Sequence, residues 1–334
     1  MHTSEPLPMT TPAPTRSFWS SFAEYLGERF PVPVTLLLSV ATALGAYATA
    51  QAEIIRAGNA PLIIDGTALA GCLMIFLFLF HLRVFDEHKD YQLDAETRPD
   101  RPVQRGVITL GQLKVLGAIA AAGQIALALA AGPKLAALYA IPMAYSLLMY
   151  VEFFARDWLA ARIGWYAISH TVVMCLLALV LGVRYADGAF GVPPALWGFV
   201  ALNLTSFLSV DVLRKIWAPP TEVDGLDSYS KRYGIPRACS LGAALIVASA
   251  AIAGWTGWNL GGRIGWLAVV AAVTAWGLFE IRGFAAAPTV KREKRLELVA
   301  GMHLLVLFLG LVVLAGVIGG AAIGIGDHYV TVGP

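Results

Sequence analysis

The most informative chemistry in this 334-residue chain comes from three aspartates that follow one another at intervals of four residues. Asp86, Asp90 and Asp94 lie just after an apolar run at 61–80. Residues four apart occupy one face of a helix, so we expect the three carboxylates to stack one turn above another. Like charges in such a stack repel. Mg²⁺ relieves that repulsion because it binds carboxylate oxygens and completes its shell with phosphate and water. The spacing therefore predicts a metal and diphosphate site at a membrane surface.

An arginine-rich turn follows the aspartates. Arg98, Arg101 and Arg105 lie within the sequence TRPDRPVQRG. Each guanidinium offers forked donors that match phosphate oxygens. Pro99 and Pro102 are expected to end the preceding helix and to turn the chain back toward the carboxylates. The combination of acids and arginines favours a phosphate-bearing ligand over an ordinary solvated loop.

The composition indicates an integral membrane protein. Hydrophobic residues make up 58% of the chain, only 14% are charged, and the mean hydropathy is +0.69, whereas soluble domains carry about 25% charged residues. Cys72, Cys175 and Cys239 lie in or beside apolar runs, so we expect reduced core residues. Membrane lipids are expected partners and nucleic acid is not. The Pro- and Thr-rich residues 1–15 are predicted to form a disordered tail before a single domain at 16–334.

The predicted fold class is an all-α polytopic membrane protein with nine transmembrane helices around a central cavity. Runs of about twenty apolar residues suffice to cross a bilayer. The candidates lie near 33–51, 64–84, 112–131, 135–152, 163–183, 192–213, 238–257, 263–281 and 298–324. With the N-terminus inside and the C-terminus outside, 20 of the 24 Lys and Arg residues fall on the cytoplasmic side. We expect a bacterial inner-membrane location, with an amphipathic helix along the inner surface at 19–30.

Two charged loops occupy equivalent places in this topology. The loops at 85–111 and 214–237 follow the second and sixth helices, four helices apart, and both are expected in the cytoplasm. Asp211 lies at the end of the sixth helix, and Glu222 and Asp224 lie within the second loop. This layout predicts two four-helix pseudo-repeats and a ninth helix, arranged around one site that opens to the cytoplasm.

These features resemble the UbiA superfamily of intramembrane prenyltransferases, which has nine transmembrane helices and Asp-rich motifs after helices two and six. The family's first motif is N-x-x-x-D-x-x-x-D, followed by an R-P turn and a Gly. The three aspartates, Arg101, Pro102 and Gly106 match it, with Asp86 in place of the leading Asn. The second motif is matched loosely by Asp211, Glu222, Asp224, Gly225 and Ser228. Lys215 stands where the family often has another acid.

The resemblance implies transfer of a prenyl group from its diphosphate to a small aromatic or lipid acceptor, with two Mg²⁺ ions between the acidic clusters. The implied metal ligands are Asp86, Asp90, Asp94, Asp211 and Glu222. The implied diphosphate-binding residues are Arg83, Lys89, Arg101, Lys215 and Lys231. The expected catalytic residues are Arg101 and Lys215, which would stabilise developing charge, and Asp211 as a base. An apolar cavity between helices would shield the allylic cation and admit the prenyl tail.

Three further polar residues are candidates for the acceptor pocket. Glu152 and His170 lie near the inner ends of the fourth and fifth helices, where ionisable side chains are functional candidates. Asn203 shares a helical face with Asp211. Structural roles stay open for the same residues: Glu152 can pair with Arg156 four residues on, and a neutral His170 needs only one or two hydrogen-bond partners.

Other functions are compatible with the same site. A terpene cyclase on this scaffold would ionise the same prenyl diphosphate without a second substrate, and the first motif does not separate it from a transferase. Transfer onto a polyprenyl phosphate is a further alternative. A transporter is disfavoured because its path needs polar groups near the midplane, whereas the acids and arginines gather at the cytoplasmic boundary.

Overall fold

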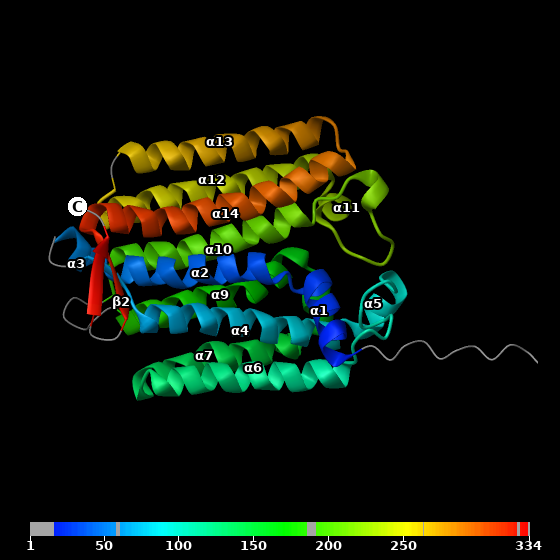
Figure 1. Ribbon diagram of the computed structural model, residues 1–334. Coiled ribbons are helices and arrows are strands. Elements are labelled where there is room, and N and C mark those ends of the chain that lie inside the picture. The colour runs from blue at the N-terminus through cyan, green and yellow to red at the C-terminus, as the bar shows by residue number, and fades with distance from the viewer. Residues whose placement is uncertain (1–16, 58–60, 186–191, 263, 326–327, 333–334) are drawn as a thin grey trace, which may run out of the picture.

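The computed structural model describes residues 17–57, 61–185, 192–262, 264–325 and 328–332, and in these the chain is almost entirely helical (Figure 1). The predicted tail at 1–15 lies outside the described residues. The long helices are α2 (Val32–Ala50), α4 (Gly66–Lys89), α6 (Leu110–Ala130), α7 (Pro133–Tyr150), α9 (Ile163–Tyr185), α10 (Pro194–Arg214), α12 (Ile235–Leu260), α13 (Ile264–Ala286) and α14 (Val290–Gly319). The short helices are α1 (Phe18–Arg29), α3 (Ala52–Arg56), α5 (Tyr91–Thr97), α8 (Arg156–Ala160) and α11 (Tyr229–Tyr233).

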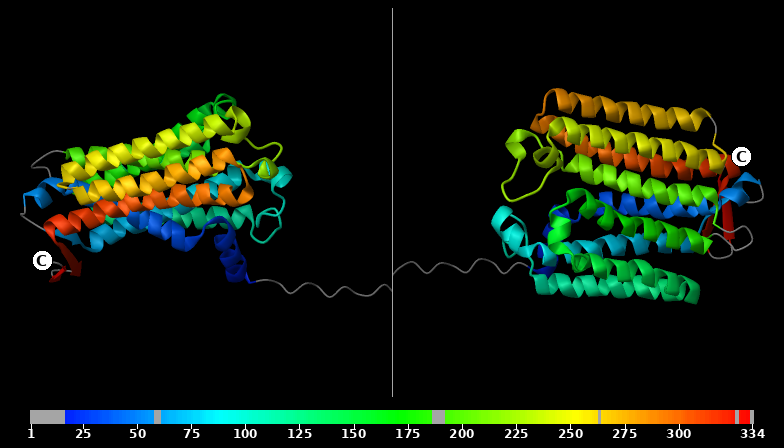
Figure 2. Two further views of the ribbon diagram at one scale, coloured as in Figure 1. Left: turned by 90° about the horizontal axis from the view of Figure 1, so that it is seen from above. Right: turned by 180° about the vertical axis from the view of Figure 1, so that it is seen from behind.

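The long helices form one bundle in which sequence neighbours are also neighbours in space. Each long helix packs against the next, from α2 through to α14, and α14 packs back against α2. Helix α2 also contacts α9 and α10, so it lies where the two halves of the chain meet (Figures 1 and 2). The all-α polytopic fold class predicted from the sequence is confirmed.

Within the described residues, eight helices are long and apolar enough to cross a membrane. The ninth long helix, α7, has 18 residues and includes Lys134 and Pro142, and both lower its mean hydropathy. It packs between α6 and α9 in the same bundle. The chain is an integral membrane protein, and the amphipathic segment expected at 19–30 forms α1 across one end of the bundle (Figure 1).

Side chains at the starts of α4 and α6 fix where these helices begin. The Asp65 carboxylate accepts hydrogen bonds from the backbone N–H groups of Thr67 (2.9 Å) and Ala68 (3.0 Å) at the start of α4. Thr109 and Gln112 form a reciprocal capping box at the start of α6. Helix α4 therefore begins at a capped residue at one end of the bundle, and it ends at the acidic segment at the other.

A small sheet closes the end of the bundle opposite to α5 and α11. Strand β1 (Leu62–Ile64) pairs in parallel with β2 (Ala321–Ile325), which pairs antiparallel with β3 (His328–Val332) (Figure 1). The helix expected at 298–324 therefore ends five residues too late, and α14 also begins eight residues earlier than expected, at Val290. It ends at Gly319 because Gly320 adopts φ 75°, a conformation that leaves the helix. The sheet joins the segment before α4 to the segment after α14.

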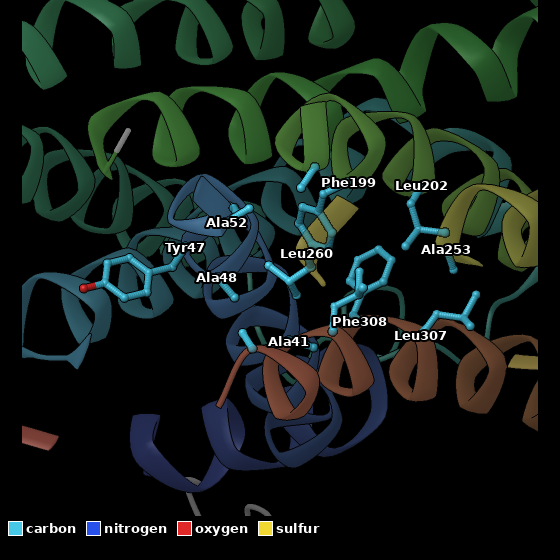
Figure 3. Packing of buried hydrophobic residues seen from close by; sticks show 14 of the residues in the cluster. Ala41, Tyr47, Ala48, Ala52, Phe199, Leu202, Ala253, Leu260, Leu307 and Phe308 are labelled. Carbon is cyan, nitrogen blue, oxygen red and sulfur yellow. The ribbon is translucent and has the colours of Figure 1, made fainter. Parts of the chain in front are cut away.

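Apolar packing is densest where α2, α10 and α14 meet (Figure 3). The Phe199 ring of α10 and the Phe308 ring of α14 lie 4.9 Å apart at 60°, and both side chains are fully buried. Gly45 of α2 faces Phe199, and a Cβ atom there would lie 2.4 Å from the ring. The close approach of α2 to α10 depends on this glycine.

Gly45→Ala is expected to lower the free energy of unfolding by about 1–3 kcal/mol, because the added methyl overlaps a ring that cannot move within the core. The measurement is thermal unfolding of the purified protein in one detergent. Gly164→Ala on α9 is the matched control, since nothing lies within 4 Å of a Cβ there. Equal Tm values for the two variants would contradict this account of the α2–α10 contact.

Candidate active site

A cavity of about 630 Å³ opens at the end of the bundle that carries α5 and α11. Its volume lies in the range of sites for small organic ligands, roughly 300–1,000 Å³. Both acidic segments contribute to it. Its charged lining residues are Arg29, Arg83, Asp86, Lys89, Asp90, Asp94, Arg98, Arg101, Asp211, Arg214, Lys215, Asp227 and Glu297. The two halves of the chain therefore bring their polar helix ends to one place.

The first acidic segment is bent. Helix α4 ends at Lys89, Asp90 has φ −95° and ψ 5°, and α5 begins at Tyr91. The expectation of one uninterrupted helix through the three aspartates is therefore wrong. Backbone bonds from Asp90 N to Asp86 O (2.9 Å) and from Asp94 N to Asp90 O (2.8 Å) still keep the four-residue spacing. The bend turns Asp94 toward the guanidinium of Arg101, with which it pairs.

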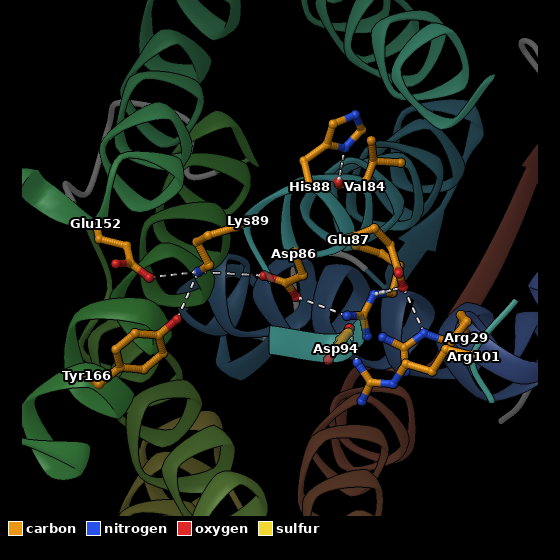
Figure 4. Close-up of polar contacts among 11 residues, drawn as sticks. Arg29, Val84, Asp86, Glu87, His88, Lys89, Asp94, Arg101, Glu152 and Tyr166 are labelled. Atoms are coloured by element: carbon orange, nitrogen blue, oxygen red, sulfur yellow. Dashed lines mark hydrogen bonds and ion pairs between the residues drawn. The ribbon is translucent and has the colours of Figure 1, made fainter. Parts of the chain in front are cut away.

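The three aspartates differ in whether a cationic side chain pairs with their carboxylate. Asp86 lies 3.5 Å from Arg83 and 3.9 Å from Lys89, and Asp94 pairs with Arg101 (Figure 4). Asp90 has no ion pair among the described residues. Burial and the charge of Asp86 raise the pKa of Asp90 to about 6, and the opposing effect of Lys89 is smaller. The surroundings of Asp90 are short of positive charge, which a bound divalent cation would supply.

Lys89 joins the acidic segment to the opposite wall of the cavity. Its ammonium donates a hydrogen bond to the Tyr166 hydroxyl (2.8 Å) and lies 3.7 Å from a carboxylate oxygen of Glu152 (Figure 4). Glu152 also pairs with Arg156 at 3.2 Å, the structural role left open by the sequence. Glu152 opens a turn of three consecutive residues with φ between 49° and 56°, ending at Phe154. Such left-handed conformations cost about 1–3 kcal/mol each and cluster at functional sites.

The second acidic segment is held by its own loop. The Asp211 carboxylate lies 2.7 Å from Lys215 Nζ and accepts a hydrogen bond from the Tyr229 hydroxyl at 3.1 Å. Burial and the Asp211 charge raise the pKa of Tyr229 well above its ordinary value, so this hydroxyl stays protonated and continues to donate. Glu222 accepts hydrogen bonds from Ser228 (2.8 Å) and Ser230 (2.7 Å).

Four residues assigned from the sequence do not line the cavity. Glu222 is engaged by the two serines of its own loop, and Lys231 lies 3.7 Å from the exposed Asp224. Asn203 is fully buried, and its Nδ2 donates to the Phe199 carbonyl oxygen at 2.8 Å, because α10 turns this face into the core. Glu152 reaches the cavity only through Lys89. The other residues assigned from the sequence are Asp86, Asp90, Asp94, Asp211, Arg83, Lys89, Arg101, Lys215 and His170, and all of them line it.

Two further arginines of the cavity are absent from the sequence-based list of diphosphate-binding residues, although the sequence pointed to Arg98 as a phosphate-matching side chain. Arg98 and Arg214 line the cavity, and neither has a side-chain hydrogen bond or ion pair to any described residue, although Arg214 interacts electrostatically with Glu297. The other five basic residues of the lining are all paired with carboxylates. Arg98 follows Asp94 by four residues and Arg214 follows Asp211 by three. The signal was present in the sequence as a basic residue one turn after each acidic segment.

The carboxylates suit a metal that is shared with a ligand. Among the described residues, no group of three or more His, Cys, Asp or Glu side chains is close enough to hold a metal ion alone. Mg²⁺ ordinarily binds through one or two carboxylates together with substrate phosphates and water. Asp86, whose carboxylate is half exposed, and Asp90, which lacks a cation, fit that role.

Helix α1 is fastened across the first acidic segment and brings one more arginine to the cavity. Arg29 Nε lies 2.7 Å from the buried carboxylate of Glu87 on α4. Arg105, from the turn after α5, lies 2.8 Å from Glu24 and 2.7 Å from Glu28. The Arg29 side chain therefore lines the cavity from outside the main bundle.

Comparisons with known proteins agree with this fold. No family model matches the sequence, and no curated protein matches it. A solved structure of digeranylgeranylglyceryl phosphate synthase superposes with a TM-score of 0.59 at 15% identity, over 89% of this chain and 99% of that one. The apo structure of a UbiA homologue from Aeropyrum pernix K1 gives a TM-score of 0.60 at 15% identity, over 82% of this chain and 96% of that one. The chain has the fold of the UbiA proteins, as the sequence resemblance predicts.

Glu87→Gln is expected to lower the free energy of unfolding by about 3–5 kcal/mol, because it removes the buried counter-charge of Arg29 and Arg83. Denaturant titration of the purified protein measures the change. Glu28→Gln is the control, since its pair with Arg105 is exposed and such pairs contribute about 0–1 kcal/mol. A loss no larger for Glu87→Gln than for Glu28→Gln would show that α1 is held by its apolar face alone.

Proposed function

We propose that this chain is a Mg²⁺-dependent intramembrane prenyltransferase that moves a prenyl group from a prenyl diphosphate to a small aromatic or lipid acceptor and releases diphosphate. The observation that carries the proposal is the cavity at the bundle end, where Asp90, Arg98 and Arg214 form no ion pair with any described residue. A metal diphosphate complements these groups, because its cation faces the acids and its phosphate oxygens face the arginines.

The charge of the cavity supports a requirement for Mg²⁺. Its lining holds seven basic and six acidic side chains, a formal excess of one positive charge. A prenyl diphosphate brings about three negative charges near neutral pH, since its terminal phosphate ionises with a pKa near 6 as other phosphate monoesters do. The protein alone does not neutralise that charge. Asp86, Asp90, Asp94 and Asp211 would hold two Mg²⁺ ions, which supply the remaining positive charge and stabilise diphosphate as a leaving group.

The protein's own groups account for binding and for protection of the cation. Arg98 and Arg214 would donate forked hydrogen bonds to phosphate oxygens from opposite halves of the cavity. The lining also contains the apolar and aromatic side chains of Phe85, Met149 and Tyr150. The Phe85 and Tyr150 rings lie 4.7 Å apart. Aromatic faces stabilise an allylic cation, and an apolar wall excludes the water that would quench it.

The cellular setting proposed for this site follows from the sequence. The distribution of Lys and Arg supports a cavity that opens to the cytoplasm, and we propose a bacterial inner membrane as its location. A prenyl tail would enter from the lipid side, and diphosphate would leave into water. The fold shared with digeranylgeranylglyceryl phosphate synthase supports the same general chemistry.

Incubation of the purified protein with Mg²⁺ and prenyl diphosphates of several lengths, with and without hydroxyaromatic acceptors, tests the proposal. Diphosphate release that requires an acceptor is expected. Release without acceptor, accompanied by a cyclic hydrocarbon or alcohol, would instead identify a terpene cyclase. Asp90→Asn is expected to abolish Mg²⁺-dependent turnover, and full activity of this variant would refute the metal site.

Arg98→Gln and Arg214→Gln are each expected to weaken Mg²⁺-dependent binding of geranyl thiolodiphosphate by about 10- to 100-fold, because each removes charge-assisted hydrogen bonds. Isothermal titration in nanodiscs measures the dissociation constant. Arg295→Gln is the matched control, since this arginine of α14 pairs with Glu280 and does not line the cavity. Equal affinities for all three variants would remove Arg98 and Arg214 from the diphosphate site.

A further inference from the structure

Helix α9 contributes to the cavity a base, His170, that takes part in none of the ion pairs described above. Tyr166 and His170 lie one turn apart and both line the cavity, with their ring centroids 4.0 Å apart and their planes at 11°. His170 Nδ1 lies 2.9 Å from the Tyr166 carbonyl oxygen and 3.2 Å from Ser169 Oγ. A carbonyl oxygen only accepts hydrogen bonds, so Nδ1 carries the hydrogen. Nε2 therefore holds the lone pair of the neutral ring.

No described residue donates a hydrogen bond to this lone pair. His170 Nε2 is shielded from water, and no hydrogen-bond partner is present in the part of the chain that the structure describes. The neighbouring Phe153 ring, 6.0 Å away at 82°, offers no polar atom. Buried side-chain nitrogens almost always have a partner, so an orphan on a cavity wall indicates a donor that arrives with a ligand.

The other candidate bases are already engaged. The Asp211 carboxylate is held by Lys215 and by the Tyr229 hydroxyl. Glu152 lies between Lys89 and Arg156. Asp86, Asp90 and Asp94 are the acids assigned to the metal. Glu297 also lines the cavity and interacts electrostatically with Arg214. Among the described lining residues, His170 is the neutral base whose lone pair, at Nε2, has no hydrogen-bond partner.

We propose that His170 is the catalytic base that accepts the proton of a hydroxyl-bearing acceptor, a phenol or an alcohol, during prenyl transfer. This inference rests on the proposed function and specifies its acceptor class. The bond between C1 of the prenyl group and the diphosphate oxygen breaks, and its electron pair leaves with diphosphate. The acceptor's hydroxyl oxygen, or the ring carbon that it activates, bonds to C1, and the hydroxyl proton passes to Nε2.

The surroundings of His170 suit this acceptor. Tyr166 stacks on the imidazole and itself accepts a hydrogen bond from Lys89. Phe85 and Tyr150, whose rings lie 4.7 Å apart, give the cavity lining further aromatic surfaces on which an aromatic or allylic group can stack. The hydroxyl of such a group finds in His170 Nε2 an acceptor that has no partner among the described residues.

The chain provides a matched control. His88 on α4 has the same local arrangement, with Nδ1 2.8 Å from the carbonyl oxygen four residues earlier, at Val84. Its ring points away from the ionic cluster, and it does not line the cavity (Figure 4). His88→Gln therefore removes a similarly bonded imidazole without touching the proposed site, whereas His170→Gln removes the proposed base and keeps a polar side chain.

The test uses the full-length protein in nanodiscs with Mg²⁺ and geranyl diphosphate. The acceptor probes are a simple phenol, a naphthol, a primary alcohol and a tetrafluorophenol that is already ionised at neutral pH. With un-ionised probes, His170→Gln is expected to lower kcat by about 100-fold, the scale of a general base. The KM for geranyl diphosphate should stay within about twofold. With the ionised phenol, which needs no base, the variant should come within about threefold of wild type.

Each outcome bears on one claim. A His170→Gln enzyme that matches wild type and His88→Gln on every probe overturns the assignment of the base. An equal loss on ionised and un-ionised phenols also overturns it, because that pattern indicates a packing role. Wild-type protein that binds geranyl thiolodiphosphate with Mg²⁺ but prenylates no hydroxyl probe overturns the acceptor class alone. Absence of Mg²⁺-dependent thiolodiphosphate binding overturns the proposed function, and this inference with it.

Discussion

The structure depends on pairing charges at the edge of an apolar bundle. Thirteen charged side chains line one cavity where desolvation is costly, and five of the seven basic ones pair with a carboxylate. The pairs reach across elements that are distant in sequence, from α1 to α4 through Arg29 and Glu87, and from α4 to the turn after α7 through Lys89 and Glu152. The same contacts that neutralise the cavity therefore hold its walls together.

The few charges left out of this pairing define what the cavity can receive. Among the described residues, a guanidinium from each half, Arg98 and Arg214, forms no ion pair, and neither does the partly buried carboxyl of Asp90. These groups are more informative than the many paired ones, since each paired charge already has a structural explanation. A ligand that satisfies these groups must present a positive charge to the carboxyl and negative charges to the guanidinium groups. A metal ion bound to a diphosphate does both.

Much of this arrangement was predictable from the sequence, because hydropathy and charge act over short stretches of chain. The apolar runs predict the helices, and the four-residue spacing of aspartates predicts the acidic segment. The bend at Asp90 and the burial of Asn203 were not predictable, because they depend on how α5 turns toward Arg101 and how α10 rotates against α12. The partners of Glu222 were missed for the same reason: two serines that follow it in sequence become its neighbours only when the loop folds back.

The three-stranded sheet at the far end has a mechanical consequence. It links the start of α4 to the end of α14, and so it ties the first acidic helix to the last helix of the other half. Backbone ladders of this kind resist sliding. Any relative rotation of the two halves would pivot near the sheet, and its displacement would grow along the length of the bundle. The lever arm is greatest at the charged end, where a small angular change would produce the largest change in the gap between Arg98 and Arg214.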